Sequence, residues 1–168
     1  MSKGDLAAVT AISAAVHGRY AEPLAVYAER LVLYPAGCFV WDDVGEVHGL
    51  LVSHPWHRDT PPALGALLGA IPANADTFYL HDIALLPETR GQGAGSAATA
   101  LVTELAVGAG LAEITLVAVN CADRFWTTQG FEHDTDAASV GYGPGTFLMH
   151  RDIDQLTRRA PSAKPPHK

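Results

Sequence analysis

The order of elements along the sequence predicts an α/β fold built on a mixed β-sheet. Two helical segments and a hairpin come first, and strand, helix, strand, helix and strand follow. With 168 residues, 48% hydrophobic and 17% charged, the chain can bury one sizeable core. We expect a single domain over residues 1–155 and a mobile tail over residues 156–168, because the ending RRAPSAKPPHK has no core residues.

Apolar spacing and turn residues define the elements of the first half. Residues 5–17 carry apolar residues at the spacing of one helix face. Pro23 can open a second helix because its fixed φ suits the first helical position. Alternating apolar residues then predict a hairpin with strands Cys38–Trp41 and Val47–Ser53. The Pro- and Ala-rich stretch that follows predicts a loop with a short helix around Leu64–Leu68.

Strands and helices alternate in the second half. The segment TFYLHDIALL, residues 77–86, predicts a strand, and the apolar stripe after the next glycines predicts a helix ending at Gly108 or Gly110. The segment EITLVAV, residues 113–119, is nearly all apolar, as expected of a strand buried on both faces. ADRFWTTQ predicts a short helix, and TFLMHRDI, residues 146–153, predicts the last strand.

Composition limits the class of protein. The formal net charge of −7 argues against a nucleic-acid partner, since phosphate binding needs a basic face. No run of 18 apolar residues exists, and the start MSKGDLAAVT lacks the features of a secretory signal. Two cysteines, Cys38 and Cys121, are too few for a disulfide framework. We therefore expect a soluble cytoplasmic protein with no membrane partner.

The stretch LLPETRGQGAGSAA, residues 85–98, places three glycines between a predicted strand and a predicted helix. The first turn of a helix has backbone N–H groups without internal partners, and it favours negative charge. Gly91, Gly93 and Gly95 lack the Cβ atoms that would keep an anion away from those donors. Arg90 adds a forked, permanent positive charge. The stretch therefore predicts a cradle for phosphate or pyrophosphate.

Other nucleotide motifs fit this stretch less well. No G-x-x-x-x-G-K-[ST] is present. GAGSAA, residues 93–98, matches the dinucleotide fingerprint G-x-G-x-x-A, but residues 87–90 separate it from its strand. A nicotinamide-dependent oxidoreductase would need Glu113 as the acid that binds ribose. Glu113 opens the next strand, whereas the ribose acid belongs at the far end of that strand.

The arrangement RGQGAG, with Arg90, Gly93 and Gly95, resembles the Q/R-x-x-G-x-G/A motif of the GNAT N-acetyltransferase superfamily. HDIALLPETRGQGAGSAATALV is similar to that family's strand, loop and pyrophosphate-binding helix, and LVAVNCADRFWTTQGFE to its next strand and a helix ending in Gly-Phe. The matching part covers Phe78–Phe131. The resemblance implies a mostly antiparallel sheet of six to seven strands flanked by helices, with one splayed strand pair. Exposed sheet edges in such folds often pair into homodimers.

The resemblance implies that the cofactor is acetyl-CoA, which donates the acetyl group. Its pyrophosphate would lie on the N–H groups of Gly91–Ser96, near Arg90. Its pantetheine arm would lie between two splayed strands, which end at Leu85 and at Asn120. The implied cofactor-binding residues are Ile83, Ala84, Leu85, Arg90, Gly91, Gln92, Gly93, Ala94, Gly95, Ser96, Asn120, Phe125 and Trp126.

The implied reaction is transfer of the acetyl group to a primary amine, of a small molecule or a peptide, by direct attack in a ternary complex. An alkylamine is mostly protonated at pH 7, so a base helps. His81 occupies a position similar to that of a histidine used by arylalkylamine acetyltransferases of this superfamily; a hydrogen-bonded structural histidine is the alternative. Asp82, expected on the opposite face of the strand, is the second candidate base or a structural acceptor. By resemblance, strand backbone near Leu85 would stabilise the oxyanion.

Trp126 departs from the family's pattern. Many members have a tyrosine there that protonates the leaving thiolate, and an indole N–H is not a usable acid. Three hypotheses remain open. Water or another residue such as Tyr142 supplies the proton, no acid is needed, or the protein binds CoA without efficient catalysis.

The end of the hairpin, SHPWH, has two alternative interpretations. It lines the acceptor pocket, or it forms an aromatic rim on the domain. His54 and His57 are the only pair with ligand-like spacing, and neither a Cys nor a carboxylate stands beside them. We therefore expect no metal.

Overall fold

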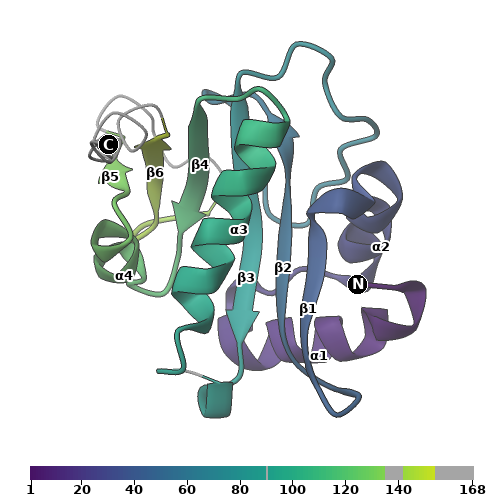
Figure 1. Cartoon of the computed structure of the whole chain (residues 1–168). Coiled ribbons are helices and arrows are strands. Elements are labelled where there is room, and N and C mark those ends of the chain that lie inside the picture. Colours follow the sequence, from purple (N-terminus) through teal and green to yellow (C-terminus); the bar gives the residue numbers. More distant parts are fainter. Residues whose placement is uncertain (90, 135–141, 154–168) are drawn as a thin grey trace, which may run out of the picture.

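In the part of the chain that the structure describes, six strands form one sheet in the order β1-β2-β3-β4-β6-β5, with helices on both faces (Figure 1). The computed structural model describes residues 1–89, 91–134 and 142–153. The strands are β1 (Cys38–Asp43), β2 (Glu46–Trp56), β3 (Thr77–Leu85), β4 (Glu113–Ala118), β5 (Glu132–His133) and β6 (Phe147–Asp152). The helices are α1 (Leu6–His17), α2 (Leu24–Leu33), α3 (Ala94–Gly108) and α4 (Asp123–Thr128), with short 3-10 turns at Lys3–Asp5, Gly18–Tyr20, Pro35–Gly37 and Pro87–Thr89.

Neighbouring strands are antiparallel except for β3 and β4, which are parallel. The mixed, mostly antiparallel sheet predicted from the sequence is therefore confirmed. The tail predicted over residues 156–168 lies outside the described residues. None of the described helices combines the length and the apolar character needed to span a bilayer.

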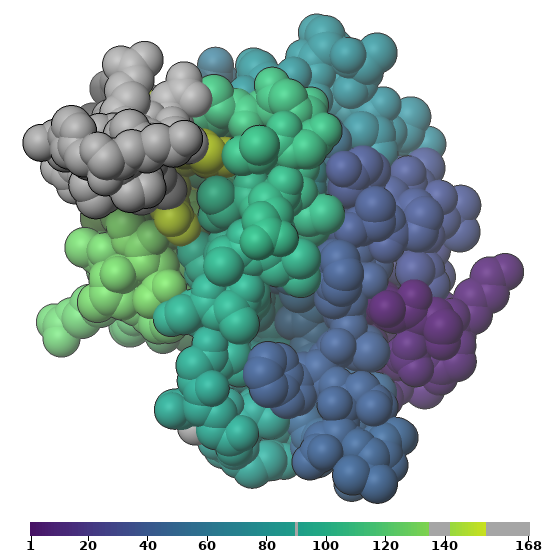
Figure 2. Space-filling view, in the orientation of Figure 1, coloured from purple at the N-terminus to yellow at the C-terminus, as the bar shows by residue number. Residues whose placement is uncertain are grey.

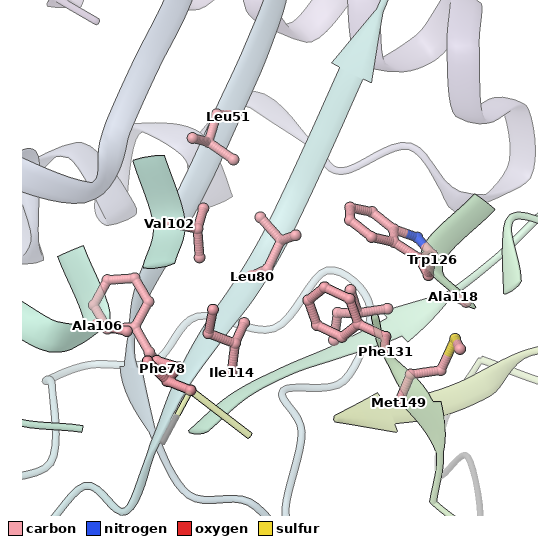
Figure 3. Packing of buried hydrophobic residues seen from close by; sticks show 12 residues of the cluster. Leu51, Phe78, Leu80, Val102, Ala106, Ile114, Ala118, Trp126, Phe131 and Met149 are labelled. Carbon is pink, nitrogen blue, oxygen red and sulfur yellow. The ribbon is translucent and has the colours of Figure 1, made fainter. Parts of the chain in front are cut away.

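The sheet separates two hydrophobic clusters. One lies between the sheet and α3, and Phe78, Leu80 and Val102 are buried in it (Figure 3). The other lies between the sheet and helices α1 and α2, with Val9 and Tyr27 buried against β1 and β2. Figure 1 shows α3 across one face and α1 and α2 behind the other. Side chains alternate between the two faces along each strand, so β2 and β3 contribute to both clusters.

β3 and β4 diverge soon after they meet. Their pairs are Phe78 with Ile114 and Tyr79 with Thr115. β3 continues to Leu85 and β4 to Ala118, with no further pair between these two strands in the described part of the chain. The splayed strand pair implied by the resemblance is therefore present, and it opens a gap in the middle of the sheet.

A β-bulge interrupts β3 where the gap begins. Val52 of β2 pairs with Asp82, but the next residue, Ser53, pairs with Leu80, so His81 is the extra residue. An extra residue shifts the alternation of side chains beyond it. Tyr79 and Ala84, on either side of the bulge, can therefore both face α1 and α2.

The predicted helix around Leu64–Leu68 is wrong. Carboxylates of the α2 region take the backbone N–H groups there instead: Glu22 accepts from Gly65 at 2.7 Å, and Glu29 accepts from Leu68 at 2.8 Å and from Gly69 at 2.9 Å. Because these N–H groups are bonded to distant side chains, they do not form a helical ladder. The result is an irregular loop tied down along α2.

The predicted hairpin is present, with longer strands and a tighter turn than expected. The turn consists of Val44 and Gly45, both with positive φ, of 52° and 84°. A two-residue turn with positive φ at both positions matches the twist of a hairpin. The two-residue strand β5 was not predicted from the sequence.

Candidate active site

A cavity of about 700 Å³ occupies the gap between β3 and β4. Its lining residues come from the end of α1 and the turn after it, from β3, from the glycine-rich turn and the start of α3, from β4 and α4, and from Leu64 and Tyr142. The cavity thus connects two parts of the chain. At one end is the turn with Gly91 and Gly93, here called the glycine-rich turn, and at the other is the segment from α1 to α2, Leu6–Leu33, here called the α1–α2 region. Figure 2 shows that this turn and the β1–β2 hairpin lie at the same edge of the molecule.

The glycine-rich turn leaves the first amides of α3 exposed to the cavity. Gly91 and Gly93 have positive φ, of 77° and 81°, which a residue with a side chain rarely adopts. Gly93 is the N-cap of α3 and provides no side-chain cap, so the N–H groups of the first turn keep their capacity to bind an anion. Arg90, predicted to lie beside them, is outside the described residues.

Gly95 allows an aromatic ring to lie against the first turn of α3. A Cβ atom added at Gly95 would lie 2.8 Å from Cζ of Phe125, so a side chain there would push the ring away. Phe125 is partly exposed and lines the cavity. This contact gives the cavity an apolar wall next to the anion-binding turn.

Most of the predicted cofactor residues lie together on this cavity, and two do not. Those that line it are Ile83, Leu85, Gly91, Gly93, Ala94, Gly95, Ser96, Asn120, Phe125 and Trp126. Ala84 is buried on the opposite face, in the cluster with α1 and α2. Gln92 is not among the lining residues, and its side-chain amide donates to the Glu88 carbonyl at 2.8 Å.

Asn120 has a structural partner in addition to its place on the cavity. Its φ is 53°, and its side-chain Nδ2 donates to the backbone carbonyl of His17 at 3.3 Å. The bond joins the end of β4 to the end of α1 across the gap. The implied role of Asn120 in binding the cofactor stays a prediction.

Trp126 is buried between the cavity and the core. Its ring centroid lies 5.3 Å from that of Phe131, and Figure 3 shows the two rings side by side above β4 and β6. The indole therefore has a packing role, and it lines the cavity at the same time.

His81 is buried more deeply than a strand residue at a cavity wall would suggest. Its side chain is 0% exposed, whereas the residue as a whole is partly exposed, so the exposed part of His81 is backbone. Neither ring nitrogen has a hydrogen-bond partner among the described residues, and the nearest carboxylate oxygen, of Glu22, is 3.6 Å from Nε2. Burial lowers the pKa of His81 well below its ordinary value, so the ring is neutral.

The prediction that Asp82 points to the opposite face of the strand from His81 is wrong. The bulge directs both side chains to the α1–α2 region, where Asp82 contacts His17 and Tyr27 and His81 lies near Glu22. The expectation failed because it assumed strict alternation, which the extra residue breaks.

Tyr142 belongs to a partly buried chain of hydrogen bonds. The Tyr79 hydroxyl donates to the Tyr142 hydroxyl, which in turn lies 3.0 Å from the Pro62 carbonyl. Burial raises the pKa of Tyr142 to about 12. Its proton is therefore held by the loop carbonyl, and the bond joins Tyr142 to the loop before β3.

Sequence reasoning missed five described residues of the α1–α2 region and the loop that line the cavity: Val16, His17, Tyr20, Glu22 and Leu64. No local signal marks them, because they reach the cavity only through the packing of α1 and the loop on the sheet. The segment SHPWH, by contrast, contributes no lining residue. His54 is fully buried behind the cavity, where its ring lies 5.6 Å from that of His81.

Glu113, the acid that a nicotinamide-binding site would need, already forms an ion pair. The Glu113 carboxylate is in contact with the Arg58 guanidinium, whose Nη2 also lies 3.0 Å from Asp134. Burial raises the pKa of Glu113. Glu113 stands at the start of β4, far along the strand from the glycine-rich turn.

Known protein families and solved structures were compared with this chain, and the matches have the same fold. The profile of the acetyltransferase (GNAT) family matches residues 10–131. No curated protein sequence matches the chain.

Several solved structures share the fold. The GphF GNAT-like decarboxylase in complex with isobutyryl-CoA is 16% identical, with a TM-score of 0.75 over 91% of this chain and 97% of that one. Ard1 from Thermoplasma volcanium is 18% identical, with a TM-score of 0.68 over 91% and 94%. Naa20 from Chaetomium thermophilum, in complex with a bisubstrate analogue, is 15% identical, with a TM-score of 0.66 over 100% and 92%.

Proposed function

Because the chain belongs to the GNAT family of acetyltransferases, we propose that it transfers an acetyl group from acetyl-CoA to a primary amine bound in the same cavity. The observation that carries the proposal is the cavity itself. It begins at an exposed helix N-terminus with a glycine-rich turn and continues between two diverging strands to a polar end. An elongated donor with an anionic and a reactive end suits this shape.

The described residues fit coenzyme A at three points. The capless first turn of α3 offers N–H groups to phosphate. The edge of β3 beyond Tyr79 is not covered by β4, so its backbone groups can pair with the amides of a pantetheine arm. The wall around Phe125 and Trp126 is apolar. When bound, the thioester supplies an activated acyl group.

The other end of the cavity favours a cationic acceptor. The carboxylates of Glu22 and Asp82 line it, and no Lys or Arg is among the described lining residues. Buried carboxylates attract an ammonium and repel a second carboxylate. We therefore propose an amine without a carboxylate beside it, such as an alkylamine or a peptide N-terminus, in preference to a free amino acid.

The donor site is tested by calorimetric titration with CoA, acetyl-CoA and NADH. Ser96 lies in the first turn of α3 and lines the cavity, so Ser96→Glu puts a negative charge beside the phosphates without disturbing the fold. We expect it to weaken CoA binding at least tenfold, about 1.4 kcal/mol. Ala100→Glu, exposed one turn further along α3, is the matched control and should bind as the wild type does. Equal binding by all three proteins, or tighter binding of NADH, would contradict the donor site.

The reaction is tested by the release of free thiol from acetyl-CoA. Tyramine and 1,4-diaminobutane represent amines without a carboxylate, and glutamate and glutamine represent amino acids. Transfer to the first pair alone supports the acceptor class, and transfer to amino acids alone refutes it. Tight CoA binding with no thiol release from any acceptor would instead favour a CoA-binding protein without catalysis.

A further inference from the structure

Asp82 joins two residues of the α1–α2 region into a hydrogen-bonded cluster beside the cavity. Its Oδ1 lies 2.7 Å from Nε2 of His17, and its Oδ2 lies 2.6 Å from the Tyr27 hydroxyl. The Tyr27 hydroxyl also lies 2.6 Å from Oγ of Ser13. Asp82 and Tyr27 are buried, so both carboxylate oxygens are held in fixed directions.

The carboxylate determines which nitrogen of His17 carries the proton. An ionised carboxylate can only accept hydrogen bonds, so Nε2 of His17 must be the donor to Oδ1. In the neutral ring, the lone pair that can take up a proton then resides on Nδ1. Burial raises the pKa of Tyr27, so its hydroxyl stays protonated and donates to Oδ2. When the imidazole becomes charged, the adjacent carboxylate stabilises it.

The ring of His17 lies at the cavity wall. Its side chain is 15% exposed and the residue lines the cavity, as Asp82 does. His17 is the last residue of α1, and the bond from Asn120 to its carbonyl holds this end of the helix at the tip of β4. The histidine therefore stands where β3 and β4 have diverged, beside Asp82 at the polar end of the cavity.

His81 is less suited to exchange a proton with a substrate. Its ring is fully buried and lies behind the cavity wall, and only its backbone is exposed. A base must come within hydrogen-bond reach of the proton that it removes. Residue 81 also lines the cavity, but its side chain is not exposed, so its ring does not meet that requirement, whereas the partly exposed ring of His17 does.

We propose that His17 is the general base of the reaction and that Asp82 and Tyr27 are its positioning residues; this inference rests on the proposed function. The amine nitrogen forms the C–N bond to the acyl carbon while the C–S bond breaks with its electron pair on sulfur. The proton lost by nitrogen passes to Nδ1 of His17. His17 then returns that proton to the thiolate, directly or through water, which regenerates the neutral ring.

The first test compares His17→Gln with His133→Gln. Glutamine keeps an N–H group for Asp82 but cannot take up a proton, and His133, partly exposed on β5, does not line the cavity. We expect His17→Gln to lower kcat/KM for tyramine about 10²–10⁴-fold, with the Kd for CoA changed less than threefold. His133→Gln should match the wild type. The loss should be much smaller with hydroxylamine, which is already neutral at pH 7 and needs less help from a base.

Three results would overturn the assignment. They are a wild-type rate in His17→Gln, equal losses for tyramine and hydroxylamine, and a loss confined to His81→Gln. Absence of acetyl transfer by the wild-type protein would instead refute the proposed function.

The second test needs neither donor nor acceptor. ¹⁵N NMR of the free protein should show neutral His17 as the Nε2–H tautomer, and Asp82→Asn should shift the ring towards a mixture of tautomers. An Nδ1–H tautomer in the wild type, or no change in Asp82→Asn, would refute the dyad even if the enzyme is active. The spectrum thus separates a failed dyad from a failed function.

Discussion

His54 makes the stability of this fold sensitive to mild acid, and the size of the effect follows from its burial. The ring is fully buried behind the cavity, beside the rings of Tyr79 and His81. Its Nδ1 lies 3.0 Å from the Pro55 carbonyl, and its Nε2 has no partner among the described residues. Burial lowers the pKa of His54 from 6.5 to about 4. The folded protein therefore keeps the ring neutral, whereas the unfolded chain protonates it near pH 6.5.

The sign follows from proton counting. Between pH 6.5 and about 4 the unfolded state binds a proton at His54 that the folded state does not bind. The free energy of unfolding therefore decreases as the pH falls through this range. Above pH 6.5 neither state protonates His54, and the fold has its full stability with respect to this group. With these two pKa values, the free energy of unfolding falls by about 2 kcal/mol between pH 7.5 and pH 5 through His54 alone.

The assay is urea unfolding of the wild type and of His54→Asn at pH 7.5 and pH 5. Asparagine can keep the donor to the Pro55 carbonyl but does not titrate. Lost ring packing lowers the stability of the variant at both pH values, so only the change with pH is compared. Burial raises the pKa of Glu22 and of Glu113, which stabilises the fold as the pH falls, but both carboxylates are present in both proteins.

We expect the wild type to lose about 2 kcal/mol more than His54→Asn between these pH values. As a control, the two proteins should show the same dependence between pH 7.5 and pH 9, where neither state protonates His54. Parallel curves across the acid range would show that His54 gains access to solvent or to a partner, and the reasoning from burial would be wrong.

Four further substitutions test packing and proton transfer. Gly37→Ala should destabilise by more than about 3 kcal/mol, because its Cβ would lie 1.9 Å from the Ser53 carbonyl oxygen, whereas Gly108→Ala, with open space at the end of α3, should stabilise by up to about 1 kcal/mol; urea unfolding measures both. Trp126→Tyr should not raise turnover if His17 returns the proton to the thiolate, so a large rise in kcat would show that an acid is missing. Tyr142→Phe should cost about 1–3 kcal/mol of stability, through lost hydrogen bonds, and change the transfer rate only a few-fold; a hundredfold fall in kcat with unchanged CoA affinity would make it a proton donor.

Elements with a strong local pattern could be predicted from the sequence. The helices over Leu6–His17 and Ala94–Gly108 and the strand over Thr77–Leu85 lie close to their predicted positions, because apolar spacing along one segment decides which face is buried. The glycine-rich turn is local in the same sense, since its backbone conformation depends on its own residues. The loop at Leu64–Leu68 could not be predicted, because Glu22 and Glu29, distant in sequence, take its N–H groups.

The polar end of the candidate site could not be predicted from the sequence either, because it also depends on contacts between residues that are far apart in the chain. His17 and Asp82 are 65 positions apart, and neither residue has a neighbour in sequence that suggests the pair. Their contact depends on two tertiary features: the packing of α1 on the sheet and the single extra residue at His81. Without that bulge, strict alternation would send the side chains of residues 81 and 82 to opposite faces, and Asp82 would lose its partners in α1 and α2. One extra residue in one strand therefore decides which histidine can meet a substrate.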